Sequence, residues 1–241
     1  MASVIKQTPQ ISIVIPVLNE AAGIQTTLAS IGMGAPWEIL LVDGGSQDRT
    51  CAIAMAYAQE YQLNLRRVDS APGRGRQMNV GAEQATGEMM LFLHGDTTLP
   101  PDFGAQILAL LQLPRIVGGA FQLSIRAEGW QYRVLECSVN WRSQIFGLPY
   151  GDQGIFMRRS IFRELGGFQE WPLLEDYELV RRLRAHGKLA IANSAVSTSG
   201  RRWQELGLLR TTWINQKILL GHQLGIPLDT LARWYRNPAN L

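Results

Sequence analysis

The sequence predicts an α/β fold in which a mostly parallel central sheet is flanked by helices. Short, apolar and β-branched runs recur in the first half of the chain, beginning with ISIVIPVL at residues 11–18. Segments with apolar residues at helical spacing, such as Ile24, Leu28 and Ile31, separate these runs. Strands that alternate with helices pair in parallel through right-handed crossovers. Further strands are expected within residues 37–46, 63–70 and 88–96, and helices within 19–31, 47–61 and 71–87.

The regular alternation of predicted strands and helices ends after Leu113, and longer, more aromatic segments follow. We expect a nucleotide-binding half at about residues 1–113 and an acceptor half at about 114–205, with 206–241 as a helical tail packed on the domain or at an interface. In this second part strands are expected within 115–125, 151–168 and 188–193, and helices within 129–147, 173–187 and from about 201 to Pro227.

Composition narrows the classes of protein. The chain has 241 residues, 46% of them apolar and 18% charged, and a formal net charge of +3, which does not indicate binding to nucleic acid. Cys51 and Cys137 are the only cysteines, expected as small buried side chains, which fits a reducing compartment. Neither a signal peptide nor a long apolar span is recognised, so a cytoplasmic location is expected.

Acidic residues stand at the ends of several predicted strands. Glu20, Asp43 and Asp96 each follow an apolar run, and the carboxyl ends of parallel strands converge on one crevice. Three carboxylates there repel one another unless a cation or a donor-rich ligand is present. Solvated loop acids are the alternative, and the strand-end position favours a site.

The segment HGD brings His94 next to Asp96. Magnesium and manganese take one or two carboxylates and complete their shells with phosphates and water, and Asp96 suits that role. His94 is either a ligand, better for Mn²⁺ than for Mg²⁺, or a histidine hydrogen-bonded in the crevice. Arg74 and Arg76, in PGRGRQMN, offer guanidinium groups to a diphosphate, although the spacing matches neither a P-loop nor G-x-G-x-x-G. A solvated basic loop is the alternative.

Glu175 and Asp176 open a predicted helix. The positive end of a helix dipole keeps a carboxylate ionised, as a general base must be, although acids at this position also stabilise helices without any catalytic role. After Asp43, Gly44 lets the backbone approach a ligand closely, which is weak evidence on its own.

Together and in this order, the motifs resemble a family 2 glycosyltransferase of the GT-A fold, over about residues 11–205. The matching segments are VIPVLNE, ILLVDGGSQDRT, NVGAEQATGEMMLFLHGDT and GGFQEWPLLEDYELVRRLRAHG. GRGRQMN, FLHGDT and GDQGIFMRR further resemble a bacterial subgroup of radical-SAM/selenodomain-associated transferases, some of them linked to arsenosugar biosynthesis.

The resemblance implies an inverting transfer of one sugar from a nucleotide-diphosphate donor, typically a UDP-sugar, to the hydroxyl of a small or lipid acceptor. Asp176 is implied as the base with Glu175 beside it, and Asp96 with His94 as ligands of Mn²⁺ or Mg²⁺. The implied nucleotide-binding residues are Pro16, Val17, Asn19, Glu20, Asp43, Gly44, Arg74, Arg76 and Asp96, and the implied acceptor-binding residues are Gly151, Asp152, Arg202 and Trp203.

Two departures from the family pattern limit this reading. His94 replaces the first aspartate of D-x-D, and SGRRW at 199–203 matches the Q-x-x-R-W motif of processive members only at Arg202 and Trp203. A nucleotidyltransferase is one alternative, but the N-terminal segment PVLNEAAGI lacks the triphosphate loop, rich in glycine, arginine and lysine, that it needs. A non-catalytic module that binds sugar nucleotides is the other, and the retention of three aspartates argues against it.

The tail is apolar and basic. Trp213, Ile214, Ile218 and Leu219 are expected on one helix face, with Arg210 and other cations elsewhere. We expect this face to pack on the domain; a homodimer contact and an interfacial helix at the inner face of the membrane are the alternatives.

Overall fold

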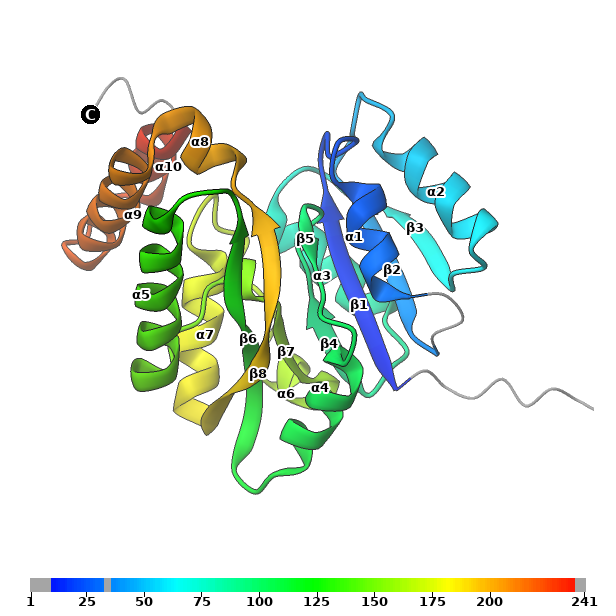
Figure 1. Cartoon of the computed structure of the whole chain (residues 1–241). Coiled ribbons are helices and arrows are strands. Elements are labelled where there is room, and N and C mark those ends of the chain that lie inside the picture. Colours follow the sequence, from blue (N-terminus) through cyan, green and yellow to red (C-terminus); the bar gives the residue numbers. More distant parts are fainter. Residues whose placement is uncertain (1–9, 33–35, 237–241) are drawn as a thin grey trace, which may run out of the picture.

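The computed structural model describes residues 10–32 and 36–236. One eight-stranded sheet, in the order β3-β2-β1-β4-β7-β6-β8-β5, runs through the molecule with helices on both sides (Figure 1). The strands are β1 Ile11–Val17, β2 Glu38–Asp43, β3 Leu65–Asp69, β4 Met89–Phe92, β5 Thr97–Thr98, β6 Ile116–Arg126, β7 Ile155–Arg158 and β8 Lys188–Ser199. The helices are α1 Ile24–Ile31, α2 Thr50–Glu60, α3 Arg74–Gln84, α4 Phe103–Gln112, α5 Trp130–Phe146, α6 Arg159–Glu164, α7 Glu175–His186, α8 Arg201–Leu206, α9 Leu208–Gln223 and α10 Leu228–Arg236, with a 3-10 turn η1 at Gly151–Gln153.

The α/β class is confirmed, and the sheet is mixed. β1 pairs in parallel with β2 and β4, and β2 with β3, as the alternation predicts. In the second half β7 runs antiparallel to both β4 and β6, β5 runs antiparallel to β8, and only β6 and β8 are parallel. The parallel first half of the sheet is therefore extended by a mixed half. The division near residue 113 stays a prediction, because the β4–β7 pairing carries the sheet across it without a break.

The apolar runs form strands because helices cover both faces of the sheet. On β1, Ile13 and Ile15 point into one core cluster, whereas Val14 packs with Leu40 and Val42 of β2 in the other. Successive side chains of a strand alternate between faces, so a strand buried on both faces must be apolar throughout. These strands fix the positions at which their carboxyl-terminal loops begin.

Several expectations about the second half need correction. The strand expected at 188–193 extends to Ser199, and the helical tail divides into α8, α9 and α10. Cys137 is exposed and Cys51 is half-buried, so the expectation of two buried cysteines is wrong. Ile214 and Ile218 pack into the protein as expected, but Trp213 on the same helix points outward.

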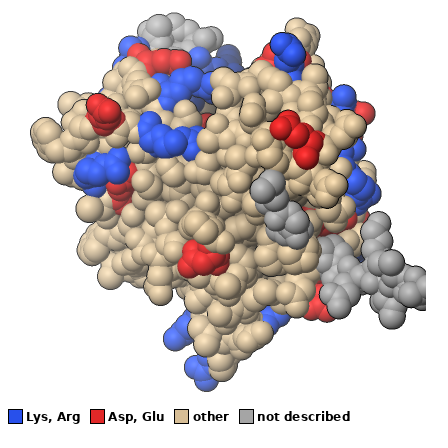
Figure 2. Space-filling model, turned by 45° about the vertical axis from the view of Figure 1, so that its right-hand side comes forward, with Lys and Arg blue, Asp and Glu red and all other residues tan. Residues whose placement is uncertain are grey.

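None of the helices within the described residues combines the length and the apolarity that crossing a membrane requires. Figure 2 shows one face of the molecule, on which acidic and basic side chains are interspersed and no continuous basic stripe is seen. This face does not present the electrostatic footprint of a nucleic-acid-binding protein.

Candidate active site

The loops after β1 and β2 are joined to each other by hydrogen bonds. The backbone N–H of Asn19 donates to Ser46 Oγ at 3.0 Å, and the N–H of Gln47 donates to Asn19 Oδ1 at 2.9 Å. The N–H of Glu20 donates to Thr50 Oγ1 at 2.7 Å. Asn19 itself has a φ of 57°, a left-handed conformation that asparagine tolerates better than most residues. These bonds hold the carboxyl ends of β1 and β2 in one fixed arrangement.

Asp43 ends β2 with both carboxylate oxygens already engaged. Oδ1 accepts from the N–H of Ser46 at 2.9 Å, and Oδ2 accepts from Arg67 at 3.2 Å. Burial opposes ionisation, but the hydrogen bonds from Ser46 and the Arg67 charge outweigh it and lower the pKa of Asp43. Next to it, Gly44 is needed for packing, since a Cβ there would lie 3.0 Å from the Gln77 amide. Asp43 thus shapes the loop, and its predicted bond to a base stays a prediction.

Two cavities open beside these loops. The first, of about 790 Å³, lies between the β1 loop, the start of α3 and the chain before α7. The second, of about 240 Å³, lies between the end of β4, the start of α7 and the helices α8 and α9. Most of the site residues predicted from the sequence line one of the two cavities. The first cavity is lined by Pro16, Val17, Glu20, Arg74, Arg76 and Glu175. The second cavity is lined by His94, Asp96, Asp152, Asp176, Arg202 and Trp203, together with Arg74 and Glu175. Asn19, Asp43, Gly44 and Gly151 line neither cavity.

The two cavities share one wall. Arg74, Leu173, Glu175 and Tyr235 line both of them. Arg74 Nη1 lies 3.3 Å from Oε1 of Glu175, which is almost wholly buried. Burial raises the pKa of Glu175, and the Arg74 charge opposes that rise. A buried carboxylate paired in this way orients the arginine between the cavities, so Glu175 is less available for proton transfer than a free acid.

Glu20 lies in the loop after β1, and His94 and Asp96 follow β4, which pairs with β1. Burial, with the nearby charge of Arg74, lowers the pKa of His94 to about 3, so its imidazole is neutral at physiological pH. Burial and the Asp96 charge raise the pKa of Glu20, whose buried Oε2 has no hydrogen-bond partner within the described residues and lies 3.6 Å from Arg201. The Asp96 carbonyl accepts from Arg126. Two carboxylates therefore face each other here without full compensation.

Asp152 and Asp176 form a second acidic pair, in the smaller cavity. Asp176 Oδ2 accepts from the N–H of Gly151 at 2.6 Å, which fixes the start of α7 against the 3-10 turn. Asp152 Oδ1 is buried and has no hydrogen-bond partner among the described residues. Burial and the charge of Asp176 raise the pKa of Asp152 to about 6. Asp176, by contrast, accepts from two backbone N–H groups, those of Gly151 and Tyr177.

The last helices close the site. Arg202 lies 3.6 Å above the Tyr235 ring and donates to the Tyr235 carbonyl at 3.2 Å, so α8 is tied to α10. Tyr235 lies in the wall common to both cavities, and Asn215 of α9 lines the smaller one. Sequence reasoning missed Tyr235, Asn215 and Arg126, and no local motif marks any of them.

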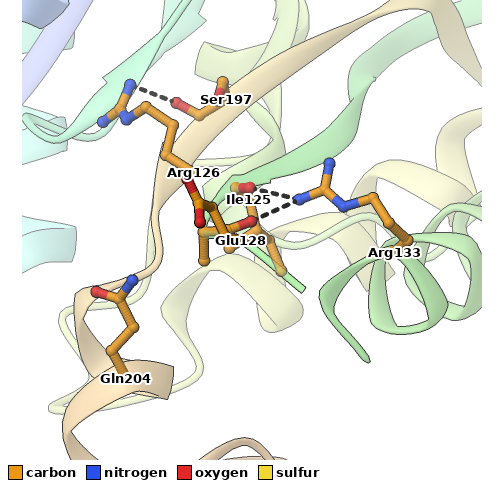
Figure 3. Close-up of a pocket in the computed structure, with 7 residues that line it drawn as sticks. Ile125, Arg126, Glu128, Arg133, Ser197 and Gln204 are labelled. Carbon is orange, nitrogen blue, oxygen red and sulfur yellow. Dashed lines mark hydrogen bonds between the residues drawn. The ribbon is translucent and has the colours of Figure 1, made fainter. Parts of the chain in front are cut away.

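A third hollow lies apart from the carboxylates (Figure 3). It measures about 620 Å³ and is lined by Arg126, Glu128, Arg133 and Gln204, among others. Both arginines are already bonded: Arg126 donates to the Ser197 carbonyl at 3.0 Å, and Arg133 to the Ile125 carbonyl at 2.7 Å. These contacts brace the end of β6, and no acid–base chemistry is assembled there.

Comparison with known proteins gives a consistent result. Residues 12–166 match the family model described as Glycosyl transferase family 2. The chain is 29% identical over 246 residues to a PGL/p-HBAD biosynthesis glycosyltransferase of Mycobacterium tuberculosis, covering 94% of this chain and 91% of the relative. It is 30% identical over 170 residues to an undecaprenyl-phosphate 4-deoxy-4-formamido-L-arabinose transferase of Pseudomonas aeruginosa, covering 63% of this chain and 48% of the relative.

Solved structures share the fold. The chain superposes on Staphylococcus aureus TarS 1–349 in complex with UDP-GlcNAc with a TM-score of 0.63 at 17% identity, covering 79% of this chain and 58% of TarS 1–349. It superposes on the mannosyltransferase PcManGT of Pyrobaculum calidifontis, in complex with GDP-Man and Mn²⁺, with a TM-score of 0.63 at 22% identity, covering 80% and 56%. The chain therefore spans less than two thirds of either structure.

Proposed function

This chain belongs to glycosyl transferase family 2, and we propose that it moves one sugar per event from a nucleotide-diphosphate donor to an acceptor hydroxyl, with inversion and with help from a divalent cation. The observation that carries the proposal is the pair of cavities with a common wall at Arg74, Glu175 and Tyr235. A donor in one cavity and an acceptor in the other would meet at that wall. Holding both reactants in line removes much of the entropic barrier to transfer.

The larger cavity suits the donor nucleotide. Its volume of about 790 Å³ lies within the usual range for pockets that hold small ligands. Arg74 and Arg76 line it, and guanidinium groups bind phosphate oxygens in a fork geometry. Arg76 lies 2.7 Å from the Glu170 carboxylate, and both side chains are about half exposed, so a diphosphate can compete for that arginine. The expectation of a UDP-sugar stays a prediction.

The residues near Asp96 fit a cation that is shared with the substrate. Burial and the Asp96 charge act on Glu20, whose buried Oε2 has no hydrogen-bond partner among the described residues, and His94 is neutral, as a ligand must be. Within the described residues no three His, Cys, Asp or Glu side chains form a complete protein site. That set suits Mg²⁺ or Mn²⁺, which fill their shells with phosphate oxygens and water. When bound, the ion would neutralise charge growing on the leaving diphosphate.

Asp176 is the proposed base. It lies at the N-terminus of α7, accepts from the N–H of Gly151, and lines the smaller cavity. The acceptor hydroxyl gives its proton to Asp176 while its oxygen bonds to the anomeric carbon, and the nucleoside diphosphate leaves with the electrons of the broken carbon–oxygen bond. Glu175 is held by Arg74, and we assign it to positioning that arginine.

The acceptor is proposed to be a lipid or another molecule with an apolar group. Apolar side chains make up much of the smaller cavity: Leu173, Leu174, Trp203, Ile218 and Leu219. The Pseudomonas aeruginosa relative is named as an undecaprenyl-phosphate 4-deoxy-4-formamido-L-arabinose transferase, which supports the same class of acceptor for this chain. The arsenosugar subgroup and single transfer rather than polymer synthesis stay predictions.

Calorimetric titration tests the donor half of the proposal. UDP, GDP, CDP and ADP would be titrated into the wild type and Asp96→Ala, with Mn²⁺, Mg²⁺ or a chelator. We expect one nucleotide to bind selectively, with the binding weakened by chelator and by Asp96→Ala. Failure of every nucleotide to bind would remove the donor assignment.

Asp176→Asn tests the catalytic half. We expect nucleotide binding to be retained and turnover to fall by about 10²–10⁴-fold, the usual contribution of a general base. Glu83→Gln, an exposed acid on α3, is the matched control. An Asp176→Asn variant with wild-type function would favour the non-catalytic module instead.

A further inference from the structure

We propose that the outer faces of α5 and α9 together form a docking surface for an anionic lipid bilayer. This apolar surface consists of Trp130, Val134, Trp141 and Ile145 of α5, Leu209, Trp213 and Leu220 of α9, and Leu224 directly after α9. The inference concerns how the protein is positioned in the cell and stands apart from the chemistry of the two cavities. Contiguous exposed apolar patches are uncommon on monomeric proteins and mark sites of association.

The α5 residues lie on one side of that helix. Their spacing of four, seven and four residues follows the helical repeat. Trp130 is 77% exposed and Trp141 is 60% exposed, whereas Tyr132 and Ser143 on the opposite side are buried. Exposed Cys137 lies in the same stripe. The helix therefore has two apolar sides, and the core uses only one.

The exposed apolar residues of α9 also lie on one side of their helix. Leu209 is 83% exposed and Leu224 is 73% exposed, whereas Ile214 and Ile218 on the opposite side are buried. Lys217 Nζ lies 4.9 Å from the centre of the Trp213 ring, a cation–π contact that holds this indole at the surface. Tryptophan at such a position suits the interface between water and hydrocarbon.

The two helices border one region of the molecule. Leu135 and Val139 of α5 pack in the same small cluster as Leu208 at the start of α9. Both helices lie on the side of the sheet away from α1 and α2, at the left in Figure 1. Both helices therefore border the same side of the molecule.

Charge identifies the partner as an anionic surface. The cations of the two helices are Arg133, Arg142, Arg210 and Lys217, and their only acid is Glu136. Glu136 is buried, where it accepts from the N–H of Ile125 and pairs with Arg133 at 3.0 Å. Basic side chains near an anionic bilayer strengthen its attraction for the protein. A second copy bound through the same face would bring these cations together, which disfavours a symmetric dimer.

The surface lies directly outside the smaller cavity. Thr211, Asn215 and Ile218 on the inner side of α9 line that cavity, so a single helix, roughly 10 Å thick, separates it from the proposed membrane contact. A lipid acceptor could then reach the carboxylates without leaving the bilayer region. This last link rests on the proposed function, whereas the docking itself does not.

Vesicle sedimentation with the full chain tests the proposal. Wild type would be mixed with vesicles of phosphatidylcholine alone or with added phosphatidylglycerol. The α5 variant is W141S/I145S, the α9 variant is L209S/L220S, and Leu113→Ser, at an exposed leucine far from both helices, is the control. We expect the wild type to bind only to the anionic vesicles. Vesicle affinity should fall by at least about tenfold in each double variant, which is well within what two apolar side chains contribute, and should not fall in the control.

An environment-sensitive dye on Cys137 gives a second readout. Burial raises the pKa of the Cys51 thiol to about 11, so the exposed Cys137 reacts selectively at neutral pH. Its emission should shift to the blue with anionic vesicles. Absence of vesicle binding, or binding unchanged in both double variants, overturns the proposal. A lipid-free dimer in sedimentation equilibrium that the same variants dissociate would replace it with self-association. Nucleotide titration of these variants separates such a failure from failure of the proposed function.

Discussion

Replacing Asp152 by asparagine should stabilise the protein at neutral pH. Burial and the Asp176 charge raise the pKa of Asp152 to about 6 from an ordinary 3.8. The folded state therefore binds this proton more tightly than the unfolded chain does. The stability that protonated Asp152 contributes is present in full below pH 3.8 and is lost as the pH rises through 6. A shift of about two pH units corresponds to about 3 kcal/mol at neutral pH.

The assay is urea unfolding followed by tryptophan fluorescence, in chelator, over a pH series. The difference in free energy of unfolding between Asp152→Asn and wild type should be near zero at about pH 3.5 and grow to about 3 kcal/mol above about pH 6.5. Glu83→Gln, which removes an exposed acid, should give no comparable difference. An Asp152→Asn variant no more stable than wild type at neutral pH, or a difference independent of pH, would refute the reasoning.

Three further outcomes are expected. Gly81→Ala places a Cβ 2.5 Å from Val14 and 2.8 Å from Val42, so α3 must move off the sheet. The unfolding temperature should fall by an amount equivalent to about 1–3 kcal/mol, and an unchanged unfolding temperature contradicts the close packing of α3 on the sheet. Phe121→Ala empties a fully buried position and should cost about 3–5 kcal/mol in urea unfolding; a loss below 1 kcal/mol would count against a close-packed core there. Burial opposes ionisation of Glu38, but its hydrogen bonds prevail and lower its pKa. The stability that ionised Glu38 contributes is therefore present above the ordinary pKa of a glutamate and is lost in acid. Glu38→Gln should show a shallower acid unfolding transition by circular dichroism, and a transition identical to that of the wild type contradicts the assignment.

The first half of the fold was predictable because its signals are local. β1 and β2 are buried on both faces, so the alternation of apolar strands and helices is visible in the sequence. The length of β8 was not predictable, because its residues alternate irregularly between buried and exposed and the strand contains register shifts against β6. The helix α4 went unrecognised although Phe103, Ile107 and Leu111 stand at helical spacing.

The candidate site, like the fold, was predictable from the sequence only in part. Strand-end placement was enough to expect that Glu20 and Asp96 lie together, and the Asp96 charge does act on Glu20. The same rule suggested a ligand-facing Asp43, whereas Ser46 and Arg67, brought in by the loop and by β3, occupy its oxygens. Which acid faces a cavity depends on the partners that other strands supply.

By itself, the sequence determined the family, through motifs that occur in a fixed order. It also determined the first parallel strands and the acids at their ends, because these depend on short-range periodicity and spacing. Only the tertiary structure decided that Tyr235, from the last helix, joins Arg74 and Glu175 in one wall, and that α5 and α9 keep an apolar side uncovered. The physical reason is that cavities and surfaces arise from packing between segments far apart in the chain. A local pattern shows that a helix has an apolar side, but not whether the rest of the protein covers it.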